Sequence, residues 1–514
     1  MQEQKRIFGL SSINFVIFLA ALVKFAIHLY SAPGYGFFGD EFYTIALSRH
    51  LAFGYVDLPP LVPALMALSR AILGESLFAM HIVPALAGAG TLVFICMITK
   101  EFGGKTFAVT LAALGFIVVP IWLSVDSVFC YDSIDQLILS VFLYTLVRFL
   151  RTGNRKLWIL LGMIAGIACM TKMTILFLGP GFLVALLASK YRKDLLTPWP
   201  WLGAALCAII VSPYLLWQYA NDWPTLEYWT NYGTHRVYQA SLPQYLVNVL
   251  VYMHTLLLPL WLAGLYRIFR RLDGVDYSFL GVFFVGALGT LFTIHASARM
   301  LAEVFMPLLA AGAVFIEELS DRAQWRKWMR VSVTMYLLAA GAVSIPLCLP
   351  ILPVEQLLSF SDSFKSMIPP VKEFNGQTFR VSPAIFGRLG WDEMIRDVAD
   401  VYNELPQEER AVAGIYAEWY MPAGAIDHLG PQYGLPHAVS GSLTYYLWGP
   451  GYSWDTMIIV AGKINYLDLF FKECEMKREV QYKYDMSFGK LYIHVCRKPV
   501  IPPDRIWPTM KSYR

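Results

Sequence analysis

The stretch LFAMHIVPALAGAGTLVFICMIT, residues 77–99, contains no Asp, Glu, Lys or Arg. An apolar tract of about 20 residues is long enough to cross the hydrocarbon core of a bilayer as a helix. A membrane β-strand needs only about 10 residues, and their polarity alternates. Because unbroken apolar tracts recur along the chain, we expect a polytopic α-helical membrane protein and not a β-barrel.

The composition of the whole chain agrees with this interpretation. Of its 514 residues, 57% are hydrophobic and only 15% are charged. Soluble proteins have about 45–50% apolar and about 25% charged residues. An ordinary soluble enzyme, a disordered protein and a disulfide scaffold are therefore excluded. The formal net charge of +4 is too balanced to indicate a nucleic-acid partner.

Eleven windows are apolar enough to predict transmembrane helices. They are residues 7–30, 77–99, 107–124, 133–149, 157–170, 175–189, 201–219, 245–268, 278–294, 300–316 and 331–349. Lys and Arg are concentrated in alternate loops, which identifies the cytoplasmic side. The other loops before the tail hold only Arg49, Arg70, Lys172, Arg236 and Arg299. We expect a cytoplasmic N-terminus and, from the odd number of spans, an outer C-terminus, in a bacterial inner membrane.

Two parts of the chain are expected outside the bilayer core. Residues 41–52 and 61–72 are amphipathic and predict two helices in the plane of the interface. From about residue 351 the hydropathy falls and charges return. Periodicity there predicts helices over 391–404, 416–429 and 464–471, and strands over 411–415, 456–461, 479–484 and 490–495. We expect a transmembrane domain over 1–350 and an outer α/β domain over 351–514.

Cysteine and histidine spacing gives no sign of zinc, because neither C-x-x-C nor H-E-x-x-H occurs. No cofactor is expected, and a divalent ion near the acidic residues has no support in the sequence. Cys474 and Cys496 fall in the outer domain, where a disulfide is permitted. The sequence leaves their pairing open. The aromatic stretch 430–454 is equally compatible with a sugar-binding surface and with packed loops.

The ionisable side chains that need an explanation gather in the expected outer loops. Charges at span ends that face one compartment are functional candidates. Carboxylates suit a general base, whereas Lys and Arg suit an anionic headgroup such as a phosphate. This combination indicates transfer of a group from a lipid phosphate to an acceptor. The candidates are Asp40, Glu41, Asp57, Asp132, Lys172, His295 and Arg299.

The stretch Asp40-Glu41-Phe42-Tyr43 resembles the Asp-Glu motif of the dolichyl-phosphate-mannose protein mannosyltransferases (glycosyltransferase family 39-like). It is similarly placed in their bacterial relatives, the aminoarabinose transferases of lipid A, which share the C-type membrane glycosyltransferase fold. Further similar stretches are 57–61 (DLPPL), 81–88 (HIVPALAG), 162–172, 217–224 (WQYANDWP) and 307–317 (PLLAAGAVFIE). The resemblance covers residues 10–320.

The resemblance implies a hexosyl- or pentosyltransferase whose donor is a sugar on a polyprenyl phosphate. Asp40 would be the general base that deprotonates an acceptor hydroxyl, which attacks the anomeric carbon with inversion. Lys172 would hold the donor phosphate, with Arg299 and His295 beside it. The residues expected to support the site or the acceptor are Glu41, Asp57 and Asp132. The acceptor would be a glycolipid such as lipid A, a polysaccharide or a protein.

Structural explanations stand beside these roles. Asp40 fits a charge at a helix N-terminus, Asp132 a helix cap and Lys172 a boundary charge. Two positions also depart from the family pattern, since relatives often carry Lys or His at Leu58 and many carry Arg at His81. These departures leave the arrangement of the phosphate site and the identity of the sugar open.

Two other functional classes remain. A transporter or flippase of lipid-linked substrates favours inverted repeats and charges at mid-membrane, and the sequence shows neither. A non-catalytic assembly or receptor protein would act through its outer domain, and Asp40, Asp132 and Lys172 would then be dispensable.

Overall fold

The computed structural model describes residues 6–7, 10–234, 239–372, 378–379, 382–462, 469–484 and 489–514. Its internal contacts divide the chain into two compact units. The first, here called the helical unit, comprises Met1–Gly34, Phe78–Pro213 and Val237–Ser382. The second, here called the sheet unit, comprises Tyr35–Leu77, Tyr214–Arg236 and Pro383–Arg514. Neither unit is a single continuous stretch of the chain.

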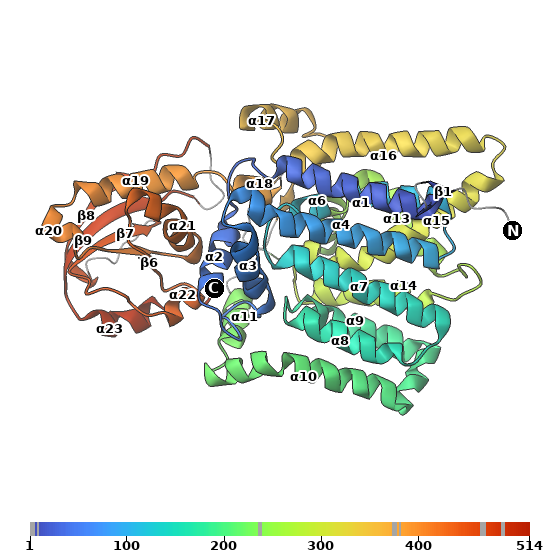
Figure 1. Ribbon diagram of the computed structural model, residues 1–514, viewed down its shortest axis with the longest axis horizontal. Helices are drawn as coiled ribbons and strands as arrows, with labels where there is room; N and C mark the ends of the chain where they lie inside the picture. The colour runs from blue at the N-terminus through green and yellow to red at the C-terminus, as the bar shows by residue number, and fades with distance from the viewer. Residues whose placement is uncertain are drawn as a thin grey trace. The chain divides into compact units, whose positions relative to one another are not determined.

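The helical unit consists of long, roughly parallel helices (Figure 1). The longest are α1 (Ser12–Ser31), α4 (Leu77–Glu101), α7 (Tyr131–Thr152), α10 (Pro198–Ala220), α15 (Met306–Arg322) and α16 (Arg326–Cys348). Shorter helices are α5 (Thr106–Val118), α6 (Pro120–Val125), α8 (Leu157–Cys169), α9 (Thr174–Ala188), α12 (Leu242–Tyr252), α13 (Leu258–Ile268), α14 (Ser278–Thr293) and α17 (Val354–Ser363). Short 3₁₀ helices include η1 (Lys190–Leu196), η2 (Thr255–Leu257), η3 (Ala298–Leu301) and η4 (Glu303–Phe305).

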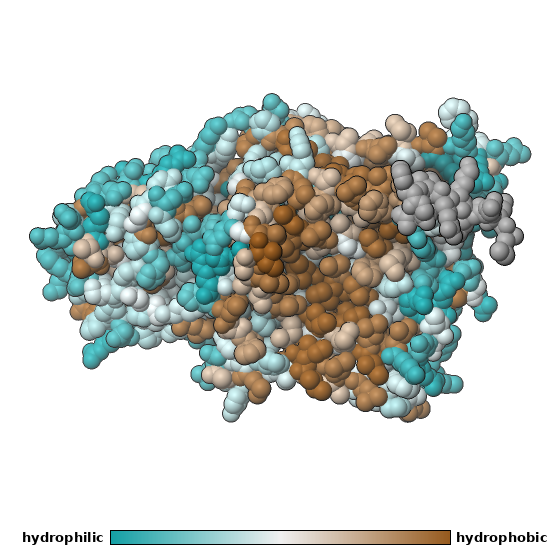
Figure 2. All heavy atoms as spheres, viewed as in Figure 1, coloured by the Kyte–Doolittle hydropathy of each residue, from teal (hydrophilic) through white to brown (hydrophobic). Residues whose placement is uncertain are grey.

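Within the described residues, six helices are long and apolar enough to cross a membrane. They are α1, α4, α7, α10, the segment Ala298–Arg322 and α16. The number rises to eight if each of two bent pairs is one span. Every expected window contains helix, but α5, α8 and α14 are shorter than a full span, so the count of eleven stays a prediction. Figure 2 shows apolar side chains over the helices of this unit and hydrophilic ones at their ends.

The window 245–268, expected as one continuous helix, is two helices bent by 93°. The turn lies at His254, whose φ of 71° is in the left-handed region. The Nδ1 of His254 accepts a hydrogen bond from the Leu256 amide at 3.3 Å, and its Nε2 donates to the Ala340 carbonyl oxygen at 3.2 Å. Hydropathy alone does not show this break, because the residues on both sides are apolar.

A buried ion pair joins α1 to the end of α6. The Nζ of Lys24 lies 2.7 Å from Oδ2 of Asp126, and both side chains are 0% exposed. Lys24 also donates to the Trp122 carbonyl oxygen at 3.1 Å, and Gln136 donates to Oδ1 of Asp126 at 2.9 Å. Burying two charges is tolerated here because each has a partner.

Lys24→Met is expected to destabilise the protein by about 3–5 kcal/mol, because Asp126 is left as an uncompensated buried charge. Thermal unfolding in detergent measures the change. The matched control is Lys105→Met, because the Lys105 side chain is 75% exposed and pairs with Asp321 at 3.3 Å, so its loss costs less than about 1 kcal/mol. The double variant Lys24→Met/Asp126→Leu should recover much of the loss. Equal melting temperatures for Lys24→Met and wild type would contradict this account.

The sheet unit is built on a five-stranded sheet of order β6-β5-β7-β9-β8 (Figure 1). Its strands are β5 (Gly414–Ala417), β6 (Ala438–Val439), β7 (Thr456–Ala461), β8 (Phe471–Glu479) and β9 (Tyr492–Pro499). Strands β6, β5 and β7 are parallel, and β9 pairs antiparallel with β7 and β8. Every residue of β5 and β7 is buried, which explains their continuous apolar character.

The helices of this unit come from both ends of the chain. From the first expected outer loop come α2 (Gly39–Arg49) and α3 (Leu61–Leu73). The others are α11 (Pro224–Thr234), α18 (Pro383–Phe386), α19 (Trp391–Glu404), α20 (Gln407–Arg410), α21 (Tyr420–Leu429), α22 (Thr444–Leu447) and α23 (Pro503–Ile506). Helix α2 packs closely on α21, where a Cβ added at Gly424 would lie 2.8 Å from the Phe42 backbone. The expected outer loop and the tail therefore share one core.

The tail agrees with the sequence in part. The helix over 391–404 and the strand over 456–461 have the expected bounds. Most of the helix expected over 464–471 lies outside the described residues. The strand expected over 479–484 is wrong, because residues 471–479 form the strand that pairs with β9. This edge strand is rich in Lys and Glu, as exposed edges often are, so it lacks an apolar signal. Cys474 and Cys496 face each other across it as a disulfide.

Candidate functional site

The residues selected from the sequence fall into two sets. Asp40, Glu41 and Asp57 belong to the sheet unit. Asp132, Lys172, His295 and Arg299 belong to the helical unit.

Asp40 stands in the first turn of α2, where a carboxylate is favoured by the helix dipole. Its side chain is half-buried. The Tyr420 hydroxyl donates a hydrogen bond to Oδ1 of Asp40 at 3.0 Å. Tyr420 is the first residue of α21, so the tail of the chain orients this acid. An ionised carboxylate accepts hydrogen bonds at both oxygens, and it can accept a proton.

Glu41 has a different environment from its neighbour. It is 1% exposed, and its Oε2 accepts a hydrogen bond from the Phe38 backbone amide at 2.8 Å. This contact closes the N-terminus of α2, where backbone amides otherwise lack partners. Glu41 therefore sets where the helix begins and, through it, where Asp40 stands.

Asp57 lies in a hydrogen-bonded group with Tyr43 and Thr444. The Tyr43 hydroxyl donates to Oδ1 of Asp57 at 2.7 Å and lies 2.8 Å from Oγ1 of Thr444. Burial raises the pKa of Asp57 to about 7, and the nearby Asp40 carboxylate acts in the same direction, against the hydrogen bond from Tyr43. Burial also raises the pKa of Tyr43 well above its usual value, so Tyr43 remains a donor.

Asp57 should make folding depend on pH. Its pKa rises from 3.8 to about 7 on folding, so the folded chain holds the proton more tightly and ionisation removes stability as the pH rises through that window. Asp57→Asn cannot ionise but can still accept from Tyr43. We expect the melting temperature of wild type to fall relative to Asp57→Asn as the pH rises between the two pKa values. Asp392→Asn, an exposed acid of α19, is the control, and parallel curves for all three proteins would refute the assignment.

The sequence did not predict which side chains surround Asp40, Glu41 and Asp57. Tyr420, Thr444, Asp427 and Tyr445 are hundreds of residues from α2 in the chain, and no local pattern marks them. The Tyr445 hydroxyl donates to Oδ2 of Asp427 at 2.7 Å, and Tyr445 is 2% exposed. Tyr445 is therefore buried inside the unit. This agrees with the interpretation of residues 430–454 as packed loops.

The second set centres on Lys172, in the turn between α8 and α9. Its Nζ lies 2.5 Å from Oδ1 of Asp132 and 5.0 Å from the centre of the Tyr131 ring. Arg299, in η3, interacts electrostatically with both Lys172 and Asp132. Asp132 stands in the first turn of α7. Two cations and a carboxylate therefore form one charged group.

Two further carboxylates adjoin this group. Asp135, one turn beyond Asp132, interacts with Lys172, and Glu303 interacts with Asp135, Lys172 and Asp132. Sequence reasoning missed Glu303, which lies within an apolar window. The described residues contain no group of three or more His, Cys, Asp or Glu arranged to hold a metal ion.

His295 and the two departures from the family pattern have local explanations. His295 lies between α14 and η3 with φ of 53°, and its role at a phosphate stays a prediction. His81 is 2% exposed, and its Nδ1 lies 3.0 Å from the Ala32 carbonyl oxygen, as in a satisfied core histidine. Leu58 is buried in the sheet unit.

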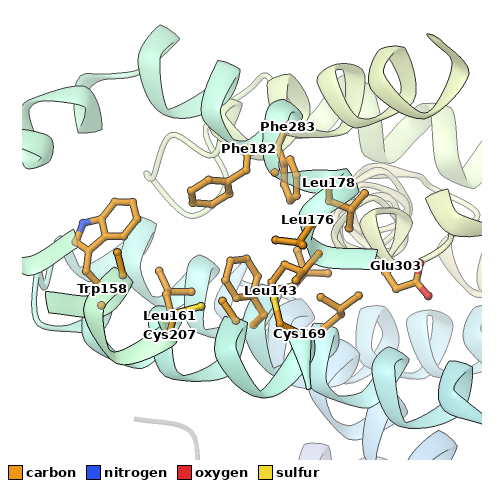
Figure 3. A pocket seen from close by; sticks show the side chains of 18 of the residues that line it. Leu143, Trp158, Leu161, Cys169, Leu176, Leu178, Phe182, Cys207, Phe283 and Glu303 are labelled. Carbon is orange, nitrogen blue, oxygen red and sulfur yellow. The ribbon is translucent and has the colours of Figure 1, made fainter. Parts of the chain in front are cut away.

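An apolar cavity of about 290 Å³ lies among α7, α8, α9, α10 and α14 (Figure 3). Its walls include Leu143, Leu161, Phe182 and Phe283. Glu303 is the one charged side chain among its described lining residues. The cavity is therefore apolar, with one carboxyl group on its wall, and that carboxyl interacts electrostatically with Lys172. Such a space suits a hydrocarbon chain.

Comparison with known proteins shows similarity along most of the chain. The sequence model of the family described as dolichyl-phosphate-mannose-protein mannosyltransferase matches residues 57–217. Lipid A galacturonosyltransferase RgtD from Rhizobium johnstonii is 23% identical over 439 residues, which cover 80% of this chain and 85% of that protein. The family match includes Asp57, Asp132 and Lys172 and begins after Asp40.

Two solved structures have a similar fold. ArnT from Cupriavidus metallidurans, bound to undecaprenyl phosphate, aligns with a TM-score of 0.58 at 12% identity over 93% of this chain and 97% of that one. Archaeal oligosaccharyltransferase AglB from Archaeoglobus fulgidus, in complex with an inhibitory peptide and a dolichol-phosphate, aligns with a TM-score of 0.50 at 9% identity over 81% and 63%. The resemblance to C-type membrane glycosyltransferases is confirmed, and the chain is an integral membrane protein with a sheet-containing C-terminal part.

Proposed function

We propose that this C-type membrane glycosyltransferase moves a sugar from a polyprenyl-phosphate donor to a hydroxyl or phosphate acceptor at the outer face of the membrane, with inversion. The observations that carry the proposal are the apolar cavity of the helical unit and, in the same unit, the cations Lys172 and Arg299 grouped with Asp132. An isoprenoid chain requires an apolar space, and its phosphate requires fixed positive charge such as Lys172 and Arg299.

The proposed reaction uses one acid and two cations. Asp40 accepts the proton of the acceptor hydroxyl, whose oxygen attacks the anomeric carbon. The bond between that carbon and the phosphate oxygen breaks, and polyprenyl phosphate leaves with the electron pair. Lys172 and Arg299 stabilise the negative charge of the leaving phosphate. Asp57 and Glu41 support Asp40, Asp132 orients Lys172, and His295 adds a phosphate contact.

The comparisons support the donor class and one acceptor class. The ArnT and AglB structures hold undecaprenyl phosphate and dolichol-phosphate respectively. RgtD is by name a lipid A galacturonosyltransferase, which favours a glycolipid of the lipid A type over a polysaccharide or a protein as acceptor. The distribution of Lys and Arg supports a cytoplasmic N-terminus, with residues 351–514 outside. The similarity to a bacterial lipid A galacturonosyltransferase supports a bacterial inner membrane.

The proposal is tested in proteoliposomes. Purified protein receives radiolabelled polyprenyl-phosphate sugars and a lipid extract of its host, with protein-free liposomes as control. Label is expected in a new glycolipid, and the configuration of the new bond reports inversion. Donor that crosses the bilayer without forming product would support a flippase instead. Folded protein that transfers no sugar from any donor would overturn the proposal.

A further inference from the structure

The hydroxyl group of Tyr43 has two acceptors within hydrogen-bond distance but only one proton. Its oxygen lies 2.7 Å from Oδ1 of Asp57 and 2.8 Å from Oγ1 of Thr444. Tyr43 and Thr444 are each 2% exposed, so this contact is buried inside the sheet unit. A phenolic hydroxyl donates a single hydrogen bond. Tyr43 can therefore serve only one of the two acceptors fully at a time.

Backbone amides hold Thr444 in place as the second acceptor. The Val56 amide donates a hydrogen bond to Oγ1 of Thr444 at 3.1 Å, and the Thr444 amide donates to the Tyr43 hydroxyl oxygen at 3.3 Å. A backbone amide can only donate, so these two contacts fix both hydroxyl oxygens whatever the charge of Asp57. What remains free to change is the direction of the Tyr43 proton.

The charge of Asp57 decides which acceptor receives that proton. An ionised carboxylate accepts a stronger hydrogen bond than a neutral hydroxyl does, so the Tyr43 proton points to Asp57 when Asp57 is ionised. When Asp57 is neutral, its own proton can be donated to the Tyr43 oxygen, and the Tyr43 proton turns to Thr444. Burial raises the pKa of Asp57 to about 7. Both arrangements are therefore populated near neutrality.

Asp40 is the charged neighbour of this group. The Tyr43 ring lies 4.8 Å from the ring of Tyr420, whose hydroxyl donates to Oδ1 of Asp40 at 3.0 Å. Asp40 also interacts electrostatically with Asp57. The ring of Tyr445, on α22, lies 6.3 Å from that of Tyr43. Burial raises the pKa of both Tyr43 and Tyr445 well above the usual value, so neither carries a charge near neutrality.

An ionised Asp57 makes Asp40 a stronger base. Repulsion acts on both carboxyl groups alike, so the charge of Asp57 favours the protonated form of Asp40. An unperturbed aspartate has a pKa of about 3.9, and a general base works best when its pKa is close to the working pH. The charge of Asp57 therefore speeds proton transfer from the acceptor to Asp40.

We propose that Tyr43 is a positioning residue for sugar transfer. It donates its proton to Asp57 when that acid is charged and to Thr444 when that acid is neutral, and so controls when Asp57 strengthens Asp40 as the base. The inference rests on the proposed function and deepens it, because it gives Thr444, from the tail of the chain, a part in the reaction.

The test is kcat/KM for sugar transfer in proteoliposomes as a function of pH. For wild type we expect a rise of about three- to tenfold around pH 7, where Asp57 ionises. Asp57→Asn should stay at the lower rate without this rise. Tyr43→Phe removes the donor to the ionised acid, so the rise should move up by about one to two pH units.

Thr444 provides a variant with the opposite expected sign. Thr444→Val removes the competing acceptor and leaves the Tyr43 proton to Asp57, so the rise should move down by up to about one pH unit. Thr444→Ser keeps the acceptor and should keep the wild-type profile. Melting temperatures measured against pH report the ionisation of Asp57 without any transfer, and their midpoints should move in the same two directions.

The matched control is Tyr402→Phe, the same substitution on α19, where the hydroxyl donates to the Arg410 carbonyl oxygen at 3.1 Å. It should leave the pH profile unchanged. A lower rate in Tyr43→Phe with an unmoved midpoint would mean a purely structural role, and it overturns the inference but keeps the transferase. Shifts of the same sign in Tyr43→Phe and Thr444→Val also overturn it. Absence of transfer by folded wild type removes the proposed function and the inference with it.

Discussion

Asp40→Asn is expected to lower kcat for sugar transfer by about 10²–10⁴-fold, the range for loss of a general base. The amide keeps the size of the side chain and can still accept from Tyr420, but it cannot take a proton from the acceptor. Because Asp40 is half-buried at a helix N-terminus, the fold should survive the substitution. Single-turnover transfer of radiolabelled sugar measures the loss, and thermal unfolding confirms that the variant is folded.

Two further variants separate catalysis from structure at this position. Asp392→Asn places the same change in the first turn of α19, at an exposed site of the same unit, and should leave the rate unchanged. Tyr420→Phe removes only the hydrogen bond that orients Asp40 and should lower the rate by roughly tenfold, in line with a hydrogen bond to a charged group. Full activity of Asp40→Asn would move the base to Asp57, whose pKa of about 7 suits proton transfer near neutrality.

Lys172→Gln should lower kcat/KM by about 10²–10³-fold, the usual size of the loss when one stabilising group is removed from a developing anion. Lys172→Arg keeps the charge and should retain much more activity. Inhibition by polyprenyl phosphate provides an independent measurement, because the product binds the same cations. Its inhibition constant should rise in Lys172→Gln.

Lys172 forms an ion pair with Asp132, so the effect of Lys172→Gln on structure must be separated from its effect on catalysis. Loss of Lys172 leaves Asp132 without its partner at 2.5 Å, so part of the effect is structural. Lys172→Gln/Asp132→Asn removes the unpaired charge and should restore stability without restoring turnover. Lys105→Gln changes an exposed lysine and should have no effect. Recovery of activity in the double variant would show that Lys172 serves only to balance Asp132.

The positions of the apolar helices could be predicted because hydropathy is a property of each stretch by itself. All eleven windows contain helix, and the amphipathic stretches after the first span are α2 and α3. Asp40 could be selected because it stands beside a second acid in an expected outer loop, and Lys172 because it lies in an expected outer loop, on the side where Lys and Arg are few. Each of these features can be recognised from a short stretch of sequence, without knowing which distant segments pack against it.

The partners of those residues could not be predicted. Tyr420 reaches Asp40 across 380 positions of the chain, and Thr444 reaches Tyr43 across 401. The disulfide of Cys474 and Cys496 depended on the register of β8 against β9. Glu303 could not be selected from the sequence because it lies in an apolar window, although in the structure it interacts electrostatically with Asp132 and Asp135.

The sequence by itself determined that this chain enters a membrane, where its apolar helices begin and which charged residues deserve attention. Only the tertiary structure decided that residues 35–77 and 214–236 fold with the tail, and which side chains hydrogen-bond to Asp40 and Asp57. The physical reason is that hydropathy and helix signals act between neighbours in the chain. Hydrogen bonding, burial and charge pairing depend on distances in space, which arise only after distant segments have packed.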